Sequence, residues 1–77
     1  MAQDEYIRDF DTRQIIGILR YKDNGDIYAV EFSSRQILGI YRKSTDDTIE
    51  FNTRKVVTKG NSVVSFIYSA WEKKKHK

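Results

Sequence analysis

A five-residue phrase occurs three times in this chain and constrains its fold more than any other feature. The copies occupy residues 9–13, 31–35 and 50–54, and each reads acid, Phe, small polar residue, hydroxyl residue, Arg. They begin 22 and 19 residues apart, and each is followed by Gln or Lys and then by two aliphatic residues. A short period of this kind means that one supersecondary unit is used repeatedly. The phrase therefore predicts an architecture, and it carries little catalytic information.

The length and composition limit how such a chain can be stabilised. It has 77 residues, no Cys and a single His, His76. A core of this size gives a low free energy of unfolding, and small domains are commonly stabilised further by disulfides, a metal or a partner subunit. Without Cys there is neither a disulfide nor a thiolate ligand, and one His does not build a zinc site. We expect a single domain, no metal and no cofactor, with oligomerisation burying the additional surface.

Neither a membrane span nor a leader is expected. No apolar run approaches the roughly 20 residues of a transmembrane helix, and the acidic residues 1–11 contain no hydrophobic stretch of the signal-peptide kind. We therefore expect a cytoplasmic protein without membrane contact.

The net charge of +3 belongs to the C-terminal tail. Residues 72–77 contain Glu72 and four lysines, which leaves ten basic and ten acidic residues in the rest of the chain. Folded nucleic-acid binders usually carry a basic excess on the face that meets phosphate. The body of this chain shows no such excess.

Alternating apolar residues separated by turn residues predict a β-meander over residues 1–60. Asn24-Gly25 fits a two-residue type I′ hairpin loop. The repeated phrase predicts two-residue loops as well, at residues 11–12, 33–34 and 52–53. Six strands are expected, near residues 5–10, 13–22, 26–32, 35–43, 47–51 and 54–59.

These loops set a strand register and two sheet faces. They place Tyr21 opposite Tyr28 and Leu19 opposite Val30. Gly17 and Gly39 occupy the same place in their repeats, which predicts a bend or bulge in a curled sheet. One face would carry Ile15, Leu19, Tyr21, Tyr28, Val30, Phe32, Ile37 and Tyr41. The other would carry Ile16, Ile18, Ile27, Ala29, Leu38, Ile40 and Val57, with Arg20, Lys22 and Arg42 towards one end.

After Gly60 the pattern changes to a helical one. Polar residues at 62, 65, 69 and 72 are spaced three, four and three apart, with apolar residues between them. This predicts an amphipathic helix over residues 61–72, capped by Asn61 or Ser62, and a basic tail over 73–77. Val and Phe favour strands, so the alternative is that this segment forms a seventh strand and the chain closes into a small barrel.

One helix covers only one of two apolar sheet faces, and large exposed apolar patches are rare on monomers. We therefore expect the second face to pack on another subunit, in a homo-oligomer and most simply a dimer. The residues predicted for this interface are Ile16, Ile18, Ile27, Leu38, Ile40 and Val57.

The repeated arginines have two interpretations. They would lie at one end of the meander, about 10 Å apart, where they could bind an anion such as nucleic acid together with the tail. Each also follows an acid four residues earlier, so local charge pairing is the favoured interpretation. The candidate anion-binding residues are Arg13, Arg35, Arg54, Lys73, Lys74 and Lys75.

No motif for catalysis accompanies these residues. The sequence has no phosphate-binding glycine loop, no nucleophile elbow and no His-based dyad. The acidic residues Asp46, Asp47 and Glu50 are interpreted as a polar turn.

The strings Phe10 to Gly17, Gly25 to Tyr28 and Phe32 to Gly39 resemble short bacterial β-repeat proteins of the four-fold beta flower kind. Those proteins alternate an Arg-x-hydrophobic-Gly strand with an Ile/Val-Tyr strand. The resemblance covers roughly residues 10–58, implies a repeat-built β domain and brings no established activity. The third copy departs from it, because Thr58 stands where Gly is expected.

The sequence thus predicts an α+β, mainly β domain: a curled antiparallel meander of five or six strands, barrel-like if it closes, followed by one C-terminal helix. The expected function is that of a small non-enzymatic oligomeric binding or adaptor protein, of a kind that suits a mobile element or phage. A nucleic-acid binder that uses the tail and the repeated arginines is the alternative.

Overall fold

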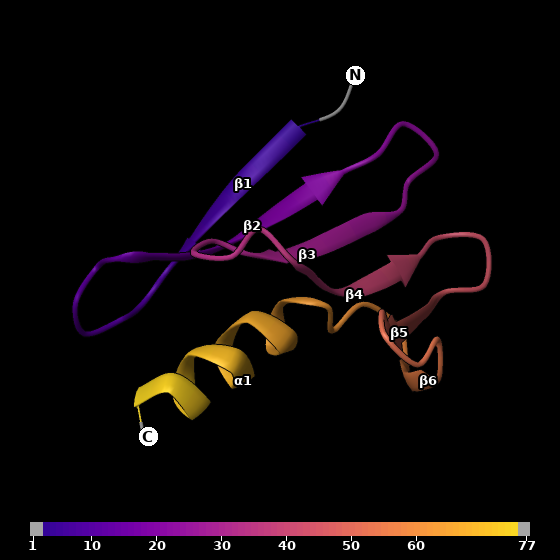
Figure 1. Ribbon diagram of the computed structural model, residues 1–77. Coiled ribbons are helices and arrows are strands. Elements are labelled where there is room, and N and C mark those ends of the chain that lie inside the picture. The colour runs from indigo at the N-terminus through magenta and orange to yellow at the C-terminus, as the bar shows by residue number, and fades with distance from the viewer. Residues whose placement is uncertain (1–2, 76–77) are drawn as a thin grey trace.

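The fold is a six-stranded antiparallel meander followed by one helix (Figure 1). The computed structural model describes residues 3–75, and their side chains as far as Lys73. The strands are β1 (Gln3–Arg8), β2 (Ile15–Tyr21), β3 (Ile27–Glu31), β4 (Ile37–Arg42), β5 (Asp47–Glu50) and β6 (Val56–Lys59), and the helix is α1 (Val64–Lys75). The mainly β architecture with a C-terminal helix is confirmed.

The sheet is open, and the C-terminal segment is helical. Every strand pairs antiparallel with its neighbour in sequence, so that within residues 3–75 the outer edges of β1 and β6 have no partner strand. The helix continues past residue 72 to Lys75, so the predicted basic tail begins inside it. His76 and Lys77 lie outside the described residues, as does the end of the predicted tail.

The repeated phrase forms a four-residue hairpin loop, and the predicted two-residue loops are wrong. In the third copy, the Glu50 amide donates to the Lys55 carbonyl at 2.9 Å, and the Arg54 amide donates to the Glu50 carbonyl at 2.8 Å. The same two bonds close the first and second copies. The arginine of each copy takes the left-handed conformation, with φ of 61° to 64°. That conformation ends the loop and returns the chain to the sheet.

The Asn24-Gly25 hairpin also has a longer loop than expected. The Lys22 amide donates to the Asp26 carbonyl at 2.8 Å, and the Gly25 amide donates to the Lys22 carbonyl at 3.0 Å. Gly25 has a φ of 96°, which only glycine adopts easily. This is a three-residue loop, a type I turn followed by a left-handed glycine, in place of a type I′ turn.

The extra loop residue shifts the register and changes the two faces. Leu19 pairs with Ala29 rather than with Val30, and Tyr21 pairs with Ile27 rather than with Tyr28. Because side chains alternate along a strand, a shift by one residue exchanges faces. The predicted grouping of Leu19 and Tyr21 with Tyr28 and Val30 is therefore wrong.

Bulges follow the repeat, as the glycines predicted. Each bulge is one unpaired residue at a shift of register. Ile16 of β2 has no partner on β1, Leu38 of β4 has none on β3, and Val57 of β6 has none on β5. Each bulge directly precedes Gly17, Gly39 or Thr58. The bulges strengthen the twist of the sheet, which is visible in Figure 1.

The helix explains why two repeats require glycine and the third does not. α1 packs over β2, β3 and β4. A Cβ on Gly17 would lie 2.4 Å from the Ile67 side chain, and one on Gly39 would lie 2.4 Å from the Phe66 ring. Thr58 belongs to β6, beyond the strands over which the helix mainly packs, so a side chain fits there.

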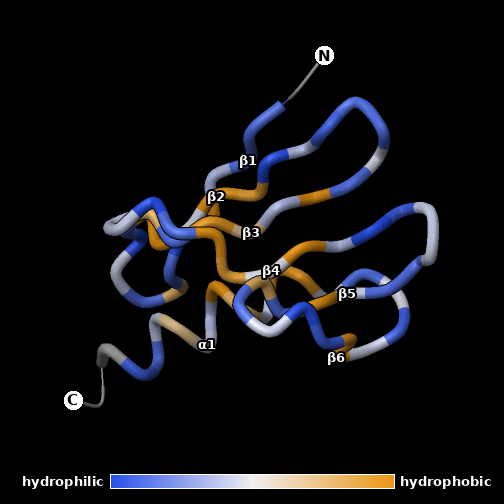
Figure 2. Tube along the Cα trace, turned by 45° about the vertical axis from the view of Figure 1, so that its right-hand side comes forward, coloured by the Kyte–Doolittle hydropathy of each residue, from blue (hydrophilic) through white to orange (hydrophobic). Residues whose placement is uncertain are grey.

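The core lies between the sheet and α1. Ile7, Leu19, Ala29, Val63 and Ile67 are among its buried members, with Trp71 and Phe66 packed against it. Figure 2 shows the apolar residues concentrated in the inner strands and the polar residues in the hairpin loops. Burial against this single layer of helix provides most of the stabilisation expected for the fold.

A buried threonine joins the helix to the sheet. The Thr48 hydroxyl donates to the Gly60 carbonyl at 2.7 Å and accepts from the Ser62 amide at 3.1 Å. Thr48 is fully buried. Its side chain therefore satisfies two backbone groups of the segment that redirects the chain from β6 into α1.

The second face of the sheet carries no helix, and we call it the open face. It contains Ile18, Val30, Ile40 and Ile49, which are between 1% and 6% exposed. Tyr6 on β1 and Val56 on β6 pair with members of this row and are 54% and 53% exposed. The centre of the open face is thus closed off by its own neighbours, and exposed apolar side chains remain at its two edges.

Candidate interaction surfaces

The three copies of the repeated phrase meet at one end of the sheet, which we call the loop end (residues 10–13, 32–35 and 51–54). They close the β1–β2, β3–β4 and β5–β6 hairpins, and alternate hairpins of a meander lie at the same end. The predicted position of Arg13, Arg35 and Arg54 in one row is therefore seen. Anion binding by this row stays a prediction.

Within each loop the hydroxyl residue bonds to the acid. The Thr12 and Thr53 hydroxyls donate to Asp9 at 3.0 Å and to Glu50 at 2.7 Å, and Ser34 donates to Glu31 in the same way. In each copy the amide two residues after the hydroxyl residue donates back to that hydroxyl. These acids and hydroxyls are therefore held by loop formation itself.

Two of the three arginines lie over their own phenylalanine. The guanidinium carbons of Arg35 and Arg54 are 4.7 and 4.6 Å from the ring centroids of Phe32 and Phe51. Such cation–π contacts stabilise by about 0.5–1 kcal/mol at exposed sites. The first copy differs, because Phe10 stacks on Tyr68 of α1, with centroids 5.8 Å apart and planes within 1°.

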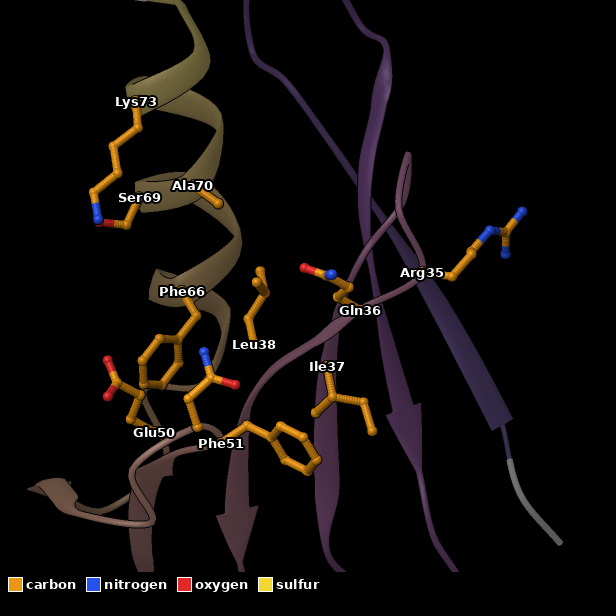
Figure 3. Close-up of a pocket in the computed structure, with 11 residues that line it drawn as sticks. Arg35, Gln36, Ile37, Leu38, Glu50, Phe51, Phe66, Ser69, Ala70 and Lys73 are labelled. Carbon is orange, nitrogen blue, oxygen red and sulfur yellow. The ribbon is translucent and has the colours of Figure 1, made fainter.

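A groove of about 750 Å³ separates α1 from the β3–β4 and β5–β6 loops. Figure 3 shows Phe66 and Lys73 projecting from the helix, Gln36 and Leu38 lying on the sheet side, and Arg35 pointing away from the helix. The lining mixes cationic, carboxylate, amide and aromatic groups. Its charges select no single class of ligand.

The opposite end of the sheet carries the polar contacts that close the remaining hairpins. Arg42 donates twice to the Asp47 carboxylate at 2.9 Å, and Thr45 donates to it at 2.8 Å. The Arg42 hydrogen bonds and charge, with Thr45, hold the pKa of Asp47 below its ordinary value. Arg42 in turn has a raised pKa because of Asp47.

Tyr41 makes the neighbouring contact at this end. Its hydroxyl donates to Asp46 at 2.6 Å, and that bond, with desolvation, raises the pKa of the phenol. Tyr21 donates likewise to Glu5 at 2.8 Å, and its pKa is raised for the same reason. These perturbed groups have structural partners within hairpins. Within residues 3–75 no three His, Asp or Glu side chains gather closely enough to hold a metal ion.

One buried donor on the helix has no protein acceptor. The indole Nε1 of Trp71 is inaccessible and forms no hydrogen bond within the described residues. Trp71, Glu31 and Ser33 line a cavity of about 60 Å³. The cavity is large enough for a water molecule and too small for a larger ligand.

The six residues predicted for an oligomer interface do not share one face. Ile16 and Ile27 belong to the core beneath α1, and Leu38 packs against that core. Ile18 and Ile40 lie on the open face and are buried, whereas Val57 is 58% exposed. The shifted register and the bulges separate these residues, so the predicted single patch is wrong. Whether any of them meets a second subunit stays a prediction.

The basic residues predicted in the tail are only partly placed. Lys73 is exposed and lines the groove. Lys74 and Lys75 belong to the last turn of α1, and their side chains lie outside the described part of the chain.

Sequence reasoning missed Tyr6. It is exposed on β1, between Asp4 and Arg8 on the same side of the strand. The signal was present, because residues 4, 6 and 8 alternate as acid, aromatic and base in the first strand. The signal is weak because apolar alternation predicts the faces of a sheet, whereas it does not indicate which strand lies at an edge.

Comparison of the chain with protein families, with curated proteins and with solved structures finds no match. The resemblance to four-fold beta flower proteins therefore stays a prediction. Within residues 3–75, the helix is too short and too polar to cross a bilayer.

Proposed function

We propose that this chain is a small non-enzymatic binding or adaptor module that acts as a homo-oligomer, in the simplest form a homodimer. The supporting observation is an open sheet in which the outer edge of β1 pairs with no strand within residues 3–75 and carries an exposed tyrosine. Four of the six β1 residues, Gln3 to Tyr6, are exposed in succession. An exposed regular edge is a ready template for pairing with another chain.

The arrangement of polar groups supports a binding role over catalysis. The carboxylate and phenol groups with perturbed pKa values, Asp47, Tyr41 and Tyr21, are engaged by partners within hairpins. A catalytic acid or base would instead face a cavity where substrate atoms can reach it. The larger groove combines aromatic and aliphatic surface with a few amide and charged groups, as binding sites do.

Self-association is tested by sedimentation equilibrium over a range from low micromolar to millimolar concentration. We expect the average mass to rise with concentration towards that of a dimer. A single species with the monomer mass over the whole range, and with an intact circular dichroism spectrum, would remove the proposal. Ile18→Asp and Leu38→Asp are unsuitable probes, because both side chains contribute to folding.

A second candidate function is binding of single-stranded nucleic acid at the loop end. Arg35 and Arg54 have a positive φ, a conformation that costs free energy for a residue other than glycine, yet both loops have arginine at this position. Each guanidinium lies over a phenylalanine ring. Aromatic rings interleaved with cations are the platforms on which bases stack.

This candidate is tested by fluorescence anisotropy with a labelled oligothymidylate at low salt. Arg35→Asn with Arg54→Asn should abolish binding, because asparagine tolerates the left-handed conformation but carries no charge. Lys43→Gln, at the opposite end of the sheet, is the matched control and should bind normally. Equal affinity of the double variant and the control would exclude the loop end as the site.

A further inference from the structure

We propose that β1 pairs with β1 of a second copy, antiparallel and in a register centred on Tyr6, so that two sheets join into one. This inference rests on the proposed self-association and names the surface that carries it. The exposed edge, its charge pattern and the direction of its backbone groups lead to the same pairing.

The two edges of the sheet differ in their protection. β6 has four residues, contains the bulge at Val57, follows Lys55 and ends at Lys59. Short length, a bulge and lysines are the devices by which proteins block edge pairing. β1 has six residues in regular register up to Ile7, and the bulge opposite it belongs to β2. The β1 edge is therefore the one able to accept a further strand.

The backbone of β1 directs hydrogen-bonding groups outward at Asp4 and Tyr6. The Lys22 amide donates to the Asp26 carbonyl, just before β3. Peptide groups alternate in direction along a strand, so Arg20 and Ile18, two and four residues earlier, also direct theirs towards β3. Their partners on β1 are Asp4 and Tyr6. These two residues are therefore in non-hydrogen-bonded pairs with β2, and their own peptide groups face away from the sheet.

The same alternation applies at the end of the strand. The Asp9 amide donates into the hairpin, to the Gln14 carbonyl. Arg8, the preceding residue, consequently points its peptide groups outward. Asp4, Tyr6 and Arg8 thus supply the donors and acceptors of the edge, and pairing two copies through them would form about six backbone hydrogen bonds.

The side chains of these three residues fix the register. When Tyr6 lies opposite the partner's Tyr6, Asp4 lies opposite the partner's Arg8, and Arg8 lies opposite the partner's Asp4. Opposite charges across a strand pair stabilise it. Asp4 is partly exposed beside Arg20 at 3.3 Å. Arg8 uses one terminal nitrogen for the Arg13 carbonyl, which leaves further donors for a carboxylate.

Registers centred on three other residues of β1 are disfavoured by like charge. A register centred on Glu5 would oppose two glutamates, and one centred on Asp4 or on Arg8 would oppose two identical charges. Like charges directly opposite each other destabilise a strand pair. Because the β6 edges stay blocked, the pairing centred on Tyr6 closes as a two-fold dimer and does not extend into a fibre.

The test is a charge exchange measured by sedimentation equilibrium with the full chain. Asp4→Arg or Arg8→Asp alone should weaken the dimer by about ten-fold or more, because two repulsive pairs replace two attractive ones. The double variant carrying both changes restores opposite charges across the interface and should recover the wild-type dissociation constant within about three-fold. Lys55→Asp, at the β6 edge, is the matched control and should leave the constant unchanged.

A second variant tests the backbone pairing. Tyr6→Pro removes an amide that makes no hydrogen bond within the sheet, and proline is tolerated at such edge positions. It should abolish the dimer while the circular dichroism spectrum stays intact. A wild-type dimer that is indifferent to all β1 variants would overturn this inference and leave self-association standing. A wild-type chain that remains monomeric would overturn both.

Discussion

Gly17→Ala tests the account of how the helix selects glycine in the repeat. The added Cβ would lie 2.4, 2.7 and 2.8 Å from three carbons of Ile67, about 1 Å inside ordinary contact. Overpacking of this kind costs about 1–3 kcal/mol. The backbone of Gly17 does not have a positive φ, so Gly→Ala would otherwise stabilise by about 0.4–1 kcal/mol through the unfolded chain. The cost of the clash exceeds this gain, and we expect a net loss of about 1–2 kcal/mol.

Urea denaturation followed by circular dichroism measures this loss. Thr58→Ala, at the equivalent position of the third repeat, is the control and should change the free energy of unfolding by less than about 0.5 kcal/mol. Ile67→Ala removes the three obstructing carbons, so Gly17→Ala should cost less in that background than in the wild type. An unchanged or raised stability of Gly17→Ala, or strict additivity with Ile67→Ala, would refute the reasoning.

Two further predictions concern polar contacts. Thr48→Val keeps the shape of the side chain but leaves two partly buried backbone groups without their side-chain partner, so it should cost about 1–3 kcal/mol in urea denaturation, whereas Thr48→Ser should cost markedly less. The pKa of Asp47 is lowered in the folded state by Arg42, so its contribution to stability is present above the unfolded pKa of about 4 and is lost as the pH falls below it. The unfolding free energy of Asp47→Asn should therefore fall less steeply between about pH 5 and pH 2 than that of the wild type, and parallel curves would contradict this assignment.

The sequence specified the order of elements well because its signals are local. The repeated phrase marked three hairpins, and the helical spacing after Gly60 identified α1 despite its β-branched residues. The glycines at 17 and 39 marked two bulges correctly. The requirement for glycine at these positions could not be predicted from the sequence, because it arises from contacts with Ile67 and Phe66 of the helix, which are distant in sequence.

The register differs from the expected one because of one loop and the bulges. The Asn24-Gly25 loop has three residues where two were expected, and the bulges at Ile16, Leu38 and Val57 each add one unpaired residue to a strand, whereas the four-residue loops of the repeated phrase leave the pairing at their ends as expected. One loop residue more or less moves every following side chain to the other face. The predicted interface, which depended on that register, consequently combined core residues such as Ile27 with open-face residues such as Ile40.

The candidate surfaces were also only partly predictable. The alignment of Arg13, Arg35 and Arg54 at one end followed from counting strands. The pairing of Arg35 and Arg54 with phenylalanine did not, since it depends on loop conformation. The β1 edge requires knowledge of which strand lies outermost and of which way its peptide groups point.

Cysteine cross-linking tests the central claim, pairing through β1 centred on Tyr6, most directly, because the chain contains no cysteine of its own. In this register the two copies of residue 6 face each other with Cα atoms about 5.5 Å apart, which lies within the range of a disulfide. Tyr6→Cys should therefore form a disulfide-linked dimer under mild oxidation, while Val57→Cys at the bulged β6 edge should remain monomeric. Efficient linkage through residue 57 with none through residue 6 would contradict the account.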